Sequence, residues 1–159
     1  MFAIHVASVT LDEIENSLPN GLHDAEIQRI SVDYAQHTVT IDLSVFVGEL
    51  DAPPEKREAY REASLLISGL QFAAIEPPDA GYPFSKAESL RVDLCDARKN
   101  LGSDLLKALP KGSFCRSIFI NEWNAFVHLA GMKAEIHWKA PVVYRNERKH
   151  FLPGESVDL

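Results

Sequence analysis

The sequence predicts a mainly β protein: an antiparallel β-sandwich or half-open barrel of six to eight strands with one or two short helices. Two observations support this class. Residues 38–47 alternate between aliphatic and mostly polar side chains, which is the period of a half-buried strand. Further segments of the same kind follow along the chain, separated by proline- and glycine-containing turns.

A hairpin at residues 25–47 is the best-defined part of this predicted fold. Ile27 is out of step with the aliphatic residues that follow it, so either a β-bulge near residues 28–29 or a strand that starts after them is predicted. A short polar connection at residues 35–37 suits a hairpin loop. In the second strand five aliphatic side chains are expected on one face and five others opposite: Val39, Ile41, Leu43, Val45 and Val47 against Thr38, Thr40, Asp42, Ser44 and Phe46.

A short amphipathic helix is predicted before the hairpin. Thr10 and Glu13 have the spacing of a capping box, in which each side chain satisfies a backbone N–H of the other residue. Leu11, Ile14 and Leu18 would then share one helical face, and the helix would end before a proline.

The rest of the chain supplies further strands and a second helix. The segment 64–75 fits a strand or a helix, and a strand bent at Ser68 and Gly69 is preferred because glycine in an apolar strand commonly marks a bulge. Residues 142–144 are expected to pair briefly. A single domain spans residues 1–159, with a mobile tail at 145–159. Strands are also predicted at 89–95, 114–121, 123–129 and 133–139, and a helix at 103–109.

Composition and charge exclude several classes of function. The net charge of −7 argues against nucleic acid as a partner, because phosphate binding needs clustered lysine and arginine. The same charge is compatible with a basic protein partner, or with solubility alone. No signal peptide and no apolar run of membrane-spanning length is recognised, so no membrane association and a cytoplasmic location are expected. Two cysteines are too few for a disulfide framework.

Four residues are candidate metal ligands: His23, His128, Glu135 and His137. Glu135 and His137 would share a face of one strand, and His128 would lie across from them if residues 123–129 and 133–139 formed a hairpin. A solvated polar face of a sheet explains the same residues without a metal, and no cofactor is predicted. Asp24 beside His23 is expected to cap a turn through an Asx hydrogen bond.

No catalytic residue is predicted, because the sequence contains no nucleophile motif and no glycine-rich phosphate loop. Three residues are candidates for contacts with a partner. Asp51 and Glu55 lie in an acidic, proline-containing loop, and Trp123 lies at a strand end, where it either joins the core or anchors a partner surface.

The residues LHDAEI at 22–27, with the strands at 32–34 and 38–43, resemble the opening of small uncharacterised bacterial β-domains that begin with an LHDA-type hairpin. Residues 119–126 and 134–138 resemble the C-terminal strands of those domains. Some of these families are similar to immunity proteins, which neutralise the toxins of neighbouring cells. The resemblance implies a β-fold and brings no catalytic residues with it.

The leading functional hypothesis is a non-enzymatic protein-interaction module, such as an immunity-like inhibitor that covers a basic toxin. Seven acidic residues motivate it: Asp12, Glu13, Glu15, Glu49, Asp51, Glu55 and Asp79. A small metal- or ligand-binding enzyme that uses the histidine and glutamate face is one alternative. A self-assembling subunit, forming a homo-oligomer through an exposed strand edge, is the other.

Overall fold

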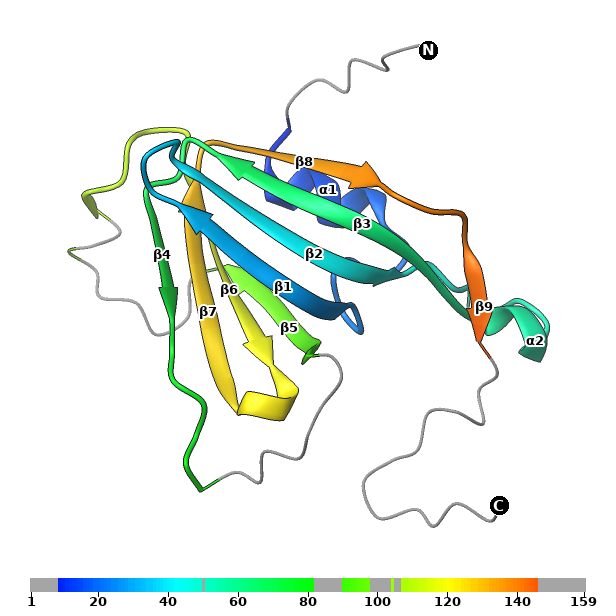
Figure 1. Ribbon diagram of the computed structural model, residues 1–159. Coiled ribbons are helices and arrows are strands. Elements are labelled where there is room, and N and C mark those ends of the chain that lie inside the picture. The colour runs from blue at the N-terminus through cyan, green and yellow to red at the C-terminus, as the bar shows by residue number, and fades with distance from the viewer. Residues whose placement is uncertain (1–8, 50, 82–89, 98–103, 105–106, 146–159) are drawn as a thin grey trace.

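The computed structural model describes residues 9–49, 51–81, 90–97, 104 and 107–145 (Figure 1). Over these residues the predicted mainly β fold is confirmed, with nine strands in one antiparallel sheet and two short helices. The strands are β1 (Glu26–Asp33), β2 (Thr38–Phe46), β3 (Glu58–Ser68), β4 (Phe72–Ile75), β5 (Leu90–Ala97), β6 (Phe114–Ile120), β7 (Ala125–Gly131), β8 (Lys133–Trp138) and β9 (Val143–Arg145). The helices are α1 (Leu11–Ser17) and α2 (Pro54–Arg57), and η1 (Asn121–Trp123) is a 3-10 turn.

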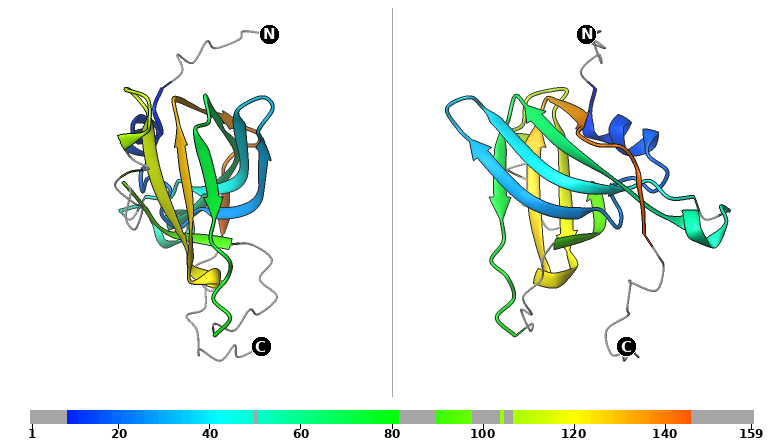
Figure 2. Two further views of the ribbon diagram at one scale, coloured as in Figure 1. Left: turned by 90° about the vertical axis from the view of Figure 1, so that its left-hand side faces the viewer. Right: turned by 45° about the vertical axis from the view of Figure 1, so that its right-hand side comes forward.

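The sheet is strongly bent, so that its two ends form two layers around one core (Figures 1 and 2). The strand order is β4-β7-β6-β5-β1-β2-β3-β8, and β9 pairs with β3 beyond the end of β8. The core lies between β1, β2, β3 and β8 on one side and β5, β6 and β7 on the other. Its largest fully buried side chains include Ile41, Leu65 and Ile67 from one layer and Ile118 and Leu129 from the other. The sheet does not close, as expected of a half-open barrel.

The predicted hairpin is confirmed in its pairing and in its bulge. β1 and β2 pair antiparallel from Asp33 and Thr38 outward, and their register shifts between Ile27 and Arg29. The aliphatic face of β2 is buried as expected. The opposite face departs from the prediction at one end, because Ser44 and Phe46 are also buried there.

The helix α1 begins as predicted. Glu13 N donates to the Thr10 hydroxyl at 3.3 Å, and Thr10 N donates to the Glu13 carboxylate at 3.0 Å, so both halves of the capping box are formed. Leu11 and Ile14 are buried against the sheet. None of the helices in the described part of the chain has the length and apolar character needed to cross a membrane.

The segment 64–75 is extended, but it is two strands and not one bent strand. β3 ends at Ser68, and β4 lies at the far end of the strand order, paired with β7. Gly69 has φ +61°, a left-handed conformation that glycine adopts readily, and it turns the chain out of β3. The next two amide groups donate to the carbonyls of His37 and Ala130, which fixes the crossing between the two layers.

The hairpin expected from the segments 123–129 and 133–139 does not form. β7 pairs with β6 and β4, whereas β8 pairs with β3, so the chain passes from one layer to the other at Gly131 and Met132. Gly131 makes this passage possible, because a Cβ there would stand 2.6 Å from Ile67 Cγ2. Trp123 lies in η1, ahead of the strand that was predicted to begin with it.

The C-terminal pairing expected at residues 142–144 is confirmed by β9, which pairs with the start of β3. Arg145 belongs to this strand, and residues 146–159 of the predicted tail lie outside the described residues. The same holds for residues 103, 105 and 106 of the predicted helix at 103–109.

Replacing Gly131 with alanine is expected to lower the free energy of unfolding by about 1–3 kcal/mol, because the new methyl group would displace the stiff, β-branched Ile67. Urea denaturation measures the change. Gly81→Ala is the control, since a Cβ there meets its nearest neighbour at an ordinary 3.4 Å. Equal stability of the two variants would contradict the close contact.

A polar link joins β2, β3 and the end of β8. Ser64 Oγ and Lys139 Nζ both donate to Asp42 Oδ1, at 2.5 and 2.8 Å. The bond from Lys139, followed by that from Ser64, lowers the pKa of the Asp42 carboxyl. The ionised form is therefore favoured by folding, and the stability it contributes is present at neutral pH and lost as the pH falls below the unfolded value of 3.8.

We therefore expect the stability difference between the wild-type protein and Asp42→Asn to be larger at neutral pH than at about pH 2. Urea denaturation at several pH values measures it. A difference that stays constant over the whole range would show that the ionised carboxyl adds nothing to folding.

Candidate functional site

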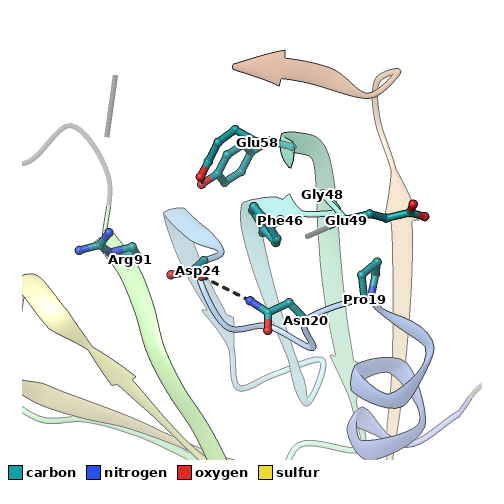
Figure 3. Close-up of a pocket in the computed structure, with 9 residues that line it drawn as sticks. Pro19, Asn20, Asp24, Phe46, Gly48, Glu49, Glu58 and Arg91 are labelled. Atoms are coloured by element: carbon teal, nitrogen blue, oxygen red, sulfur yellow. Dashed lines mark hydrogen bonds between the residues drawn. The ribbon is translucent and has the colours of Figure 1, made fainter. Parts of the chain in front are cut away.

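A pocket of about 450 Å³ opens at one end of the sheet, where β1, β3 and β5 begin and β2 ends (Figure 3). Its volume lies in the range of about 300–1,000 Å³ that is usual for small-ligand sites. In the close-up, Arg91 and Glu49 lie on opposite sides, with Phe46 and Asp24 between them. The lining residues are Pro19, Asn20, Asp24, Phe46, Gly48, Glu49, Glu58, Tyr60 and Arg91.

An aromatic pair forms one wall of the pocket. Phe46 and Tyr60 are directly paired in the ladder between β2 and β3, and their rings meet edge to face with centroids 5.5 Å apart. The guanidinium of Arg145, from β9, lies over the Tyr60 ring at 4.1 Å and pairs with the Glu26 carboxylate at 2.7 Å. The wall is therefore held in place by β1, β2, β3 and β9 together.

Carboxylates outnumber cations among the lining residues. Asp24, Glu49 and Glu58 face a single guanidinium, that of Arg91. Burial is the main reason that the pKa of Tyr60 is raised, and the charges of Glu58, Glu26 and Asp24 add to the increase against the opposing charge of Arg145. The hydroxyl therefore stays protonated, and it lies 3.4 Å from Glu58 Oε2. Such a pocket favours a cation over an anion.

Asp24 is placed by the turn between α1 and β1. It has φ 65°, a conformation that aspartate tolerates better than most residues, and its carboxylate accepts from Asn20 Nδ2 at 3.3 Å. Its backbone N–H donates to the Val92 carbonyl, which ties the turn to β5. His23 Nδ1 lies 3.0 Å from the same carboxylate. The Asp24 carboxylate is thus tied to the turn through the side chains of Asn20 and His23, and it also lines the pocket.

The acidic loop that follows β2 forms the outer margin of the pocket. Gly48 is required there, because a Cβ would collide with the carbonyl oxygen of Arg57. Pro53 and Pro54 then start α2, where a proline at the first helical position costs no hydrogen bond. Asp51 and Glu55 are both exposed, two and six residues after Glu49 in the chain. Of this loop, Gly48 and Glu49 line the pocket.

The four candidate metal ligands are found at three separate places. His128 is buried in β7, with Nδ1 at 2.7 Å from Ser117 Oγ, and its ring stacks on Phe126. Glu135 and His137 contact each other on the surface of β8, at 3.0 Å. His23 lies in the turn before β1. Since β7 and β8 do not pair, the geometry that would bring His128 to the other two is absent.

The remaining sequence candidates have structural partners. Trp123 is half-buried and packs against the core, and its carbonyl accepts from the Asp79 amide at 3.0 Å. The carboxylates of Asp12 and Glu15 on α1 both pair with Arg116 of β6. Among the residues that the structure describes, no group of three or more histidine, cysteine, aspartate or glutamate side chains is arranged to hold a metal ion.

The sequence indicated Asp24 as a turn residue and Glu49 as part of an acidic segment, but it did not predict that the two residues line one pocket. One signal was present: Phe46 is the only apolar member of the otherwise polar face of its strand. An aromatic residue at such a position indicates that the polar face is covered at that point. The contributions of Tyr60 and Arg91 depend on strand pairing, which the sequence does not state.

The fold and the pocket define an antiparallel β-domain with an aromatic and acidic surface pocket. Comparisons of this chain with protein-family models, with curated proteins and with solved structures found no match. The resemblance of the LHDA-type hairpin to bacterial immunity-like domains therefore stays a prediction.

We expect the wild-type protein to show no saturable zinc binding at micromolar concentrations, because no two of the three histidine positions converge. Isothermal titration with zinc chloride, together with the zinc content of the purified protein, measures this. One zinc per chain that is lost in His137→Asn and kept in the loop variant His37→Asn would contradict the expectation.

Proposed function

We propose that this chain is a non-enzymatic protein-interaction module that binds a basic protein through the acidic face formed by Glu49, Asp51 and Glu55 and the pocket beside it. An inhibitor of the immunity type, acting in the cytoplasm, is the kind of module that the LHDA-type hairpin suggests. The observation that supports the proposal is that an exposed acidic stretch of chain, with Asp51 and Glu55, begins at Glu49, which lines a pocket that also contains the carboxylates of Asp24 and Glu58.

The structure divides the seven acidic residues of the original hypothesis into two groups. Four have roles within the fold: Asp12 and Glu15 pair with Arg116, Glu13 completes the capping box, and Asp79 accepts from Gly81 N and Asn124. The other three, Glu49, Asp51 and Glu55, follow one another on the loop and α2. Lys56 and Arg57 come directly after Glu55 on α2, so this segment carries charges of both signs, and its three carboxylates are the groups that would attract a basic partner.

The catalytic alternative receives less support from the same geometry. His128, the buried histidine, bonds to Ser117, and its Nε2 atom is 3.9 Å from Glu76 Oε2. The serine is completely buried, so a substrate has no direct access to it in this conformation. The pair formed by Ser117 and His128 therefore gives no support to a catalytic function.

Self-association is the second candidate, and it is favoured by the exposed apolar side chains of β9. Val143 and Tyr144 are 57% and 55% exposed, on a strand that pairs with β3. A shallow groove of about 240 Å³ between this strand and α2 is lined by Val142, Tyr144 and Lys56, among others. Light scattering separates the candidates: a concentration-dependent dimer that is lost in Tyr144→Ser would favour self-association.

We expect the double charge reversal Asp51→Lys/Glu55→Lys to abolish capture of the basic partner from lysate of the source cells, because attraction becomes repulsion at the centre of the acidic face. Affinity purification followed by quantitative mass spectrometry measures the loss. The partner captured by the wild-type protein should have a net positive charge.

The matched control is Glu135→Lys/Asp104→Lys, which changes the net charge equally at exposed or half-buried sites on other segments. It should retain the partner. Equal capture by both double variants and the wild type would exclude the acidic face as the contact surface, and equal loss would indicate dependence on net charge alone.

A further inference from the structure

We propose that the pocket is a receptor for one arginine side chain of the protein partner, with the guanidinium held by the carboxylates of Asp24 and Glu58. This inference rests on the proposed interaction function and specifies its chemistry. It concerns the preformed pocket, whereas the acidic face beside it accounts for general attraction.

The walls of the pocket match the two parts of an arginine side chain. Arginine has an apolar stem and a charged, planar head, so it fits a site with apolar and acidic surfaces side by side. Pro19 and Phe46 provide the apolar surface, and Asp24 and Glu58 provide the carboxylates. These groups come from the turn before β1 and from the adjoining ends of β2 and β3, which are hydrogen-bonded neighbours.

The carboxylates are positioned before any ligand arrives. Asp24 is fixed by Asn20 and His23, at 3.3 and 3.0 Å, and by the turn that its own backbone forms with β5. Glu58 begins β3, within 3.4 Å of the Tyr60 hydroxyl, which stays protonated and serves as a donor. A ligand therefore pays little to order the site, which raises the affinity that each contact provides.

The protein already binds a guanidinium of its own in this region. Arg145 lies over the Tyr60 ring at 4.1 Å and pairs with Glu26 at 2.7 Å. An aromatic ring next to a carboxylate is thus a combination that this fold uses to hold arginine. Phe46 packs edge to face with that same Tyr60 ring and also lines the pocket, where this residue, which is 7% exposed, is the aromatic contact for a second, external guanidinium.

Arg91, on the β5 side of the pocket, restricts how a cation can be oriented in the site. Its guanidinium repels a cation from that side, so the incoming head group is directed toward Asp24 and Glu58. The same charge disfavours a small divalent metal ion, which would need several carboxylates without a neighbouring cation. The arrangement therefore selects an elongated monovalent cation.

The test uses N-acetyl-arginine amide, which has one guanidinium and no other charge, in NMR titrations of the full chain. We expect saturable shifts at Asp24, Gly48, Glu58 and Tyr60, and no saturable shifts with N-acetyl-citrulline amide, its neutral isostere. Asp24→Asn and Glu58→Gln should each weaken binding by about three- to tenfold, because each removes one charge and keeps its shape. Glu135→Gln, on β8, is the control and should bind as the wild type does.

Several outcomes would overturn the assignment. Equal binding of the citrulline compound would exclude charge recognition, and equal binding of N-acetyl-lysine amide would exclude a site for guanidinium. Tighter binding of free agmatine than of the blocked arginine would point to a small amine in place of a protein side chain. If Asp24→Asn fails to fold, as judged by circular dichroism, Glu58→Gln alone decides, since Glu58 lies on β3 and outside the turn that contains Asp24.

The failure of this inference can be distinguished from the failure of the proposed function. A basic partner that is lost in Asp51→Lys/Glu55→Lys, with no arginine binding in the pocket, would leave the interaction module intact and remove its arginine site. Arginine binding in the pocket without capture of any basic partner would support the arginine site and contradict the proposed interaction function.

Discussion

The rest of the structure depends on the pairing of β3 along its whole length. β3 has eleven residues, and β2 covers one edge of it from Ser68 to Tyr60. The other edge is shared by β8 and then β9, so one strand organises the first hairpin, the last strands and the exit of the chain. The start of β3 also supplies Glu58 and Tyr60 to the pocket, so the backbone hydrogen bonds that hold β3 in the sheet also position this wall of the pocket.

Local features of this fold were readable from the sequence because each is encoded within a few residues. Alternation along residues 38–47 specified which face of β2 is buried, and one out-of-step isoleucine specified the bulge in β1. The capping box specified the start of α1 in the same way. Each of these depends on side-chain periodicity or on a single turn of backbone, and no distant partner is needed to form it.

The order of the strands could not be predicted, because it depends on contacts between distant segments. β7 and β8 follow each other directly, yet they belong to different layers, since Gly131 lets the chain pass close to Ile67 where a hairpin would otherwise turn back. The pocket has the same origin. Its residues come from segments between Pro19 and Arg91, and each looks ordinary in its own surroundings. Only Phe46, on a polar face, marked the place in advance.

The junction between β1 and β5 has a consequence for how the molecule moves. In the described residues, two ladder pairs cross it, Glu26 with Arg91 and Ile27 with Leu90, and Val92 adds backbone hydrogen bonds to Asp24 and Ala25, so the two halves of the sheet are joined by a short backbone seam. Local opening of a protein begins where few hydrogen bonds must break. Arg91 belongs both to this seam and to the pocket, whose other lining residues lie before β1, at the end of β2, in the loop after it and at the start of β3. A ligand that contacts both sides of the pocket would slow local opening at the junction between β1 and β5. Occupancy of the pocket would therefore stabilise the pairing between the two halves of the sheet.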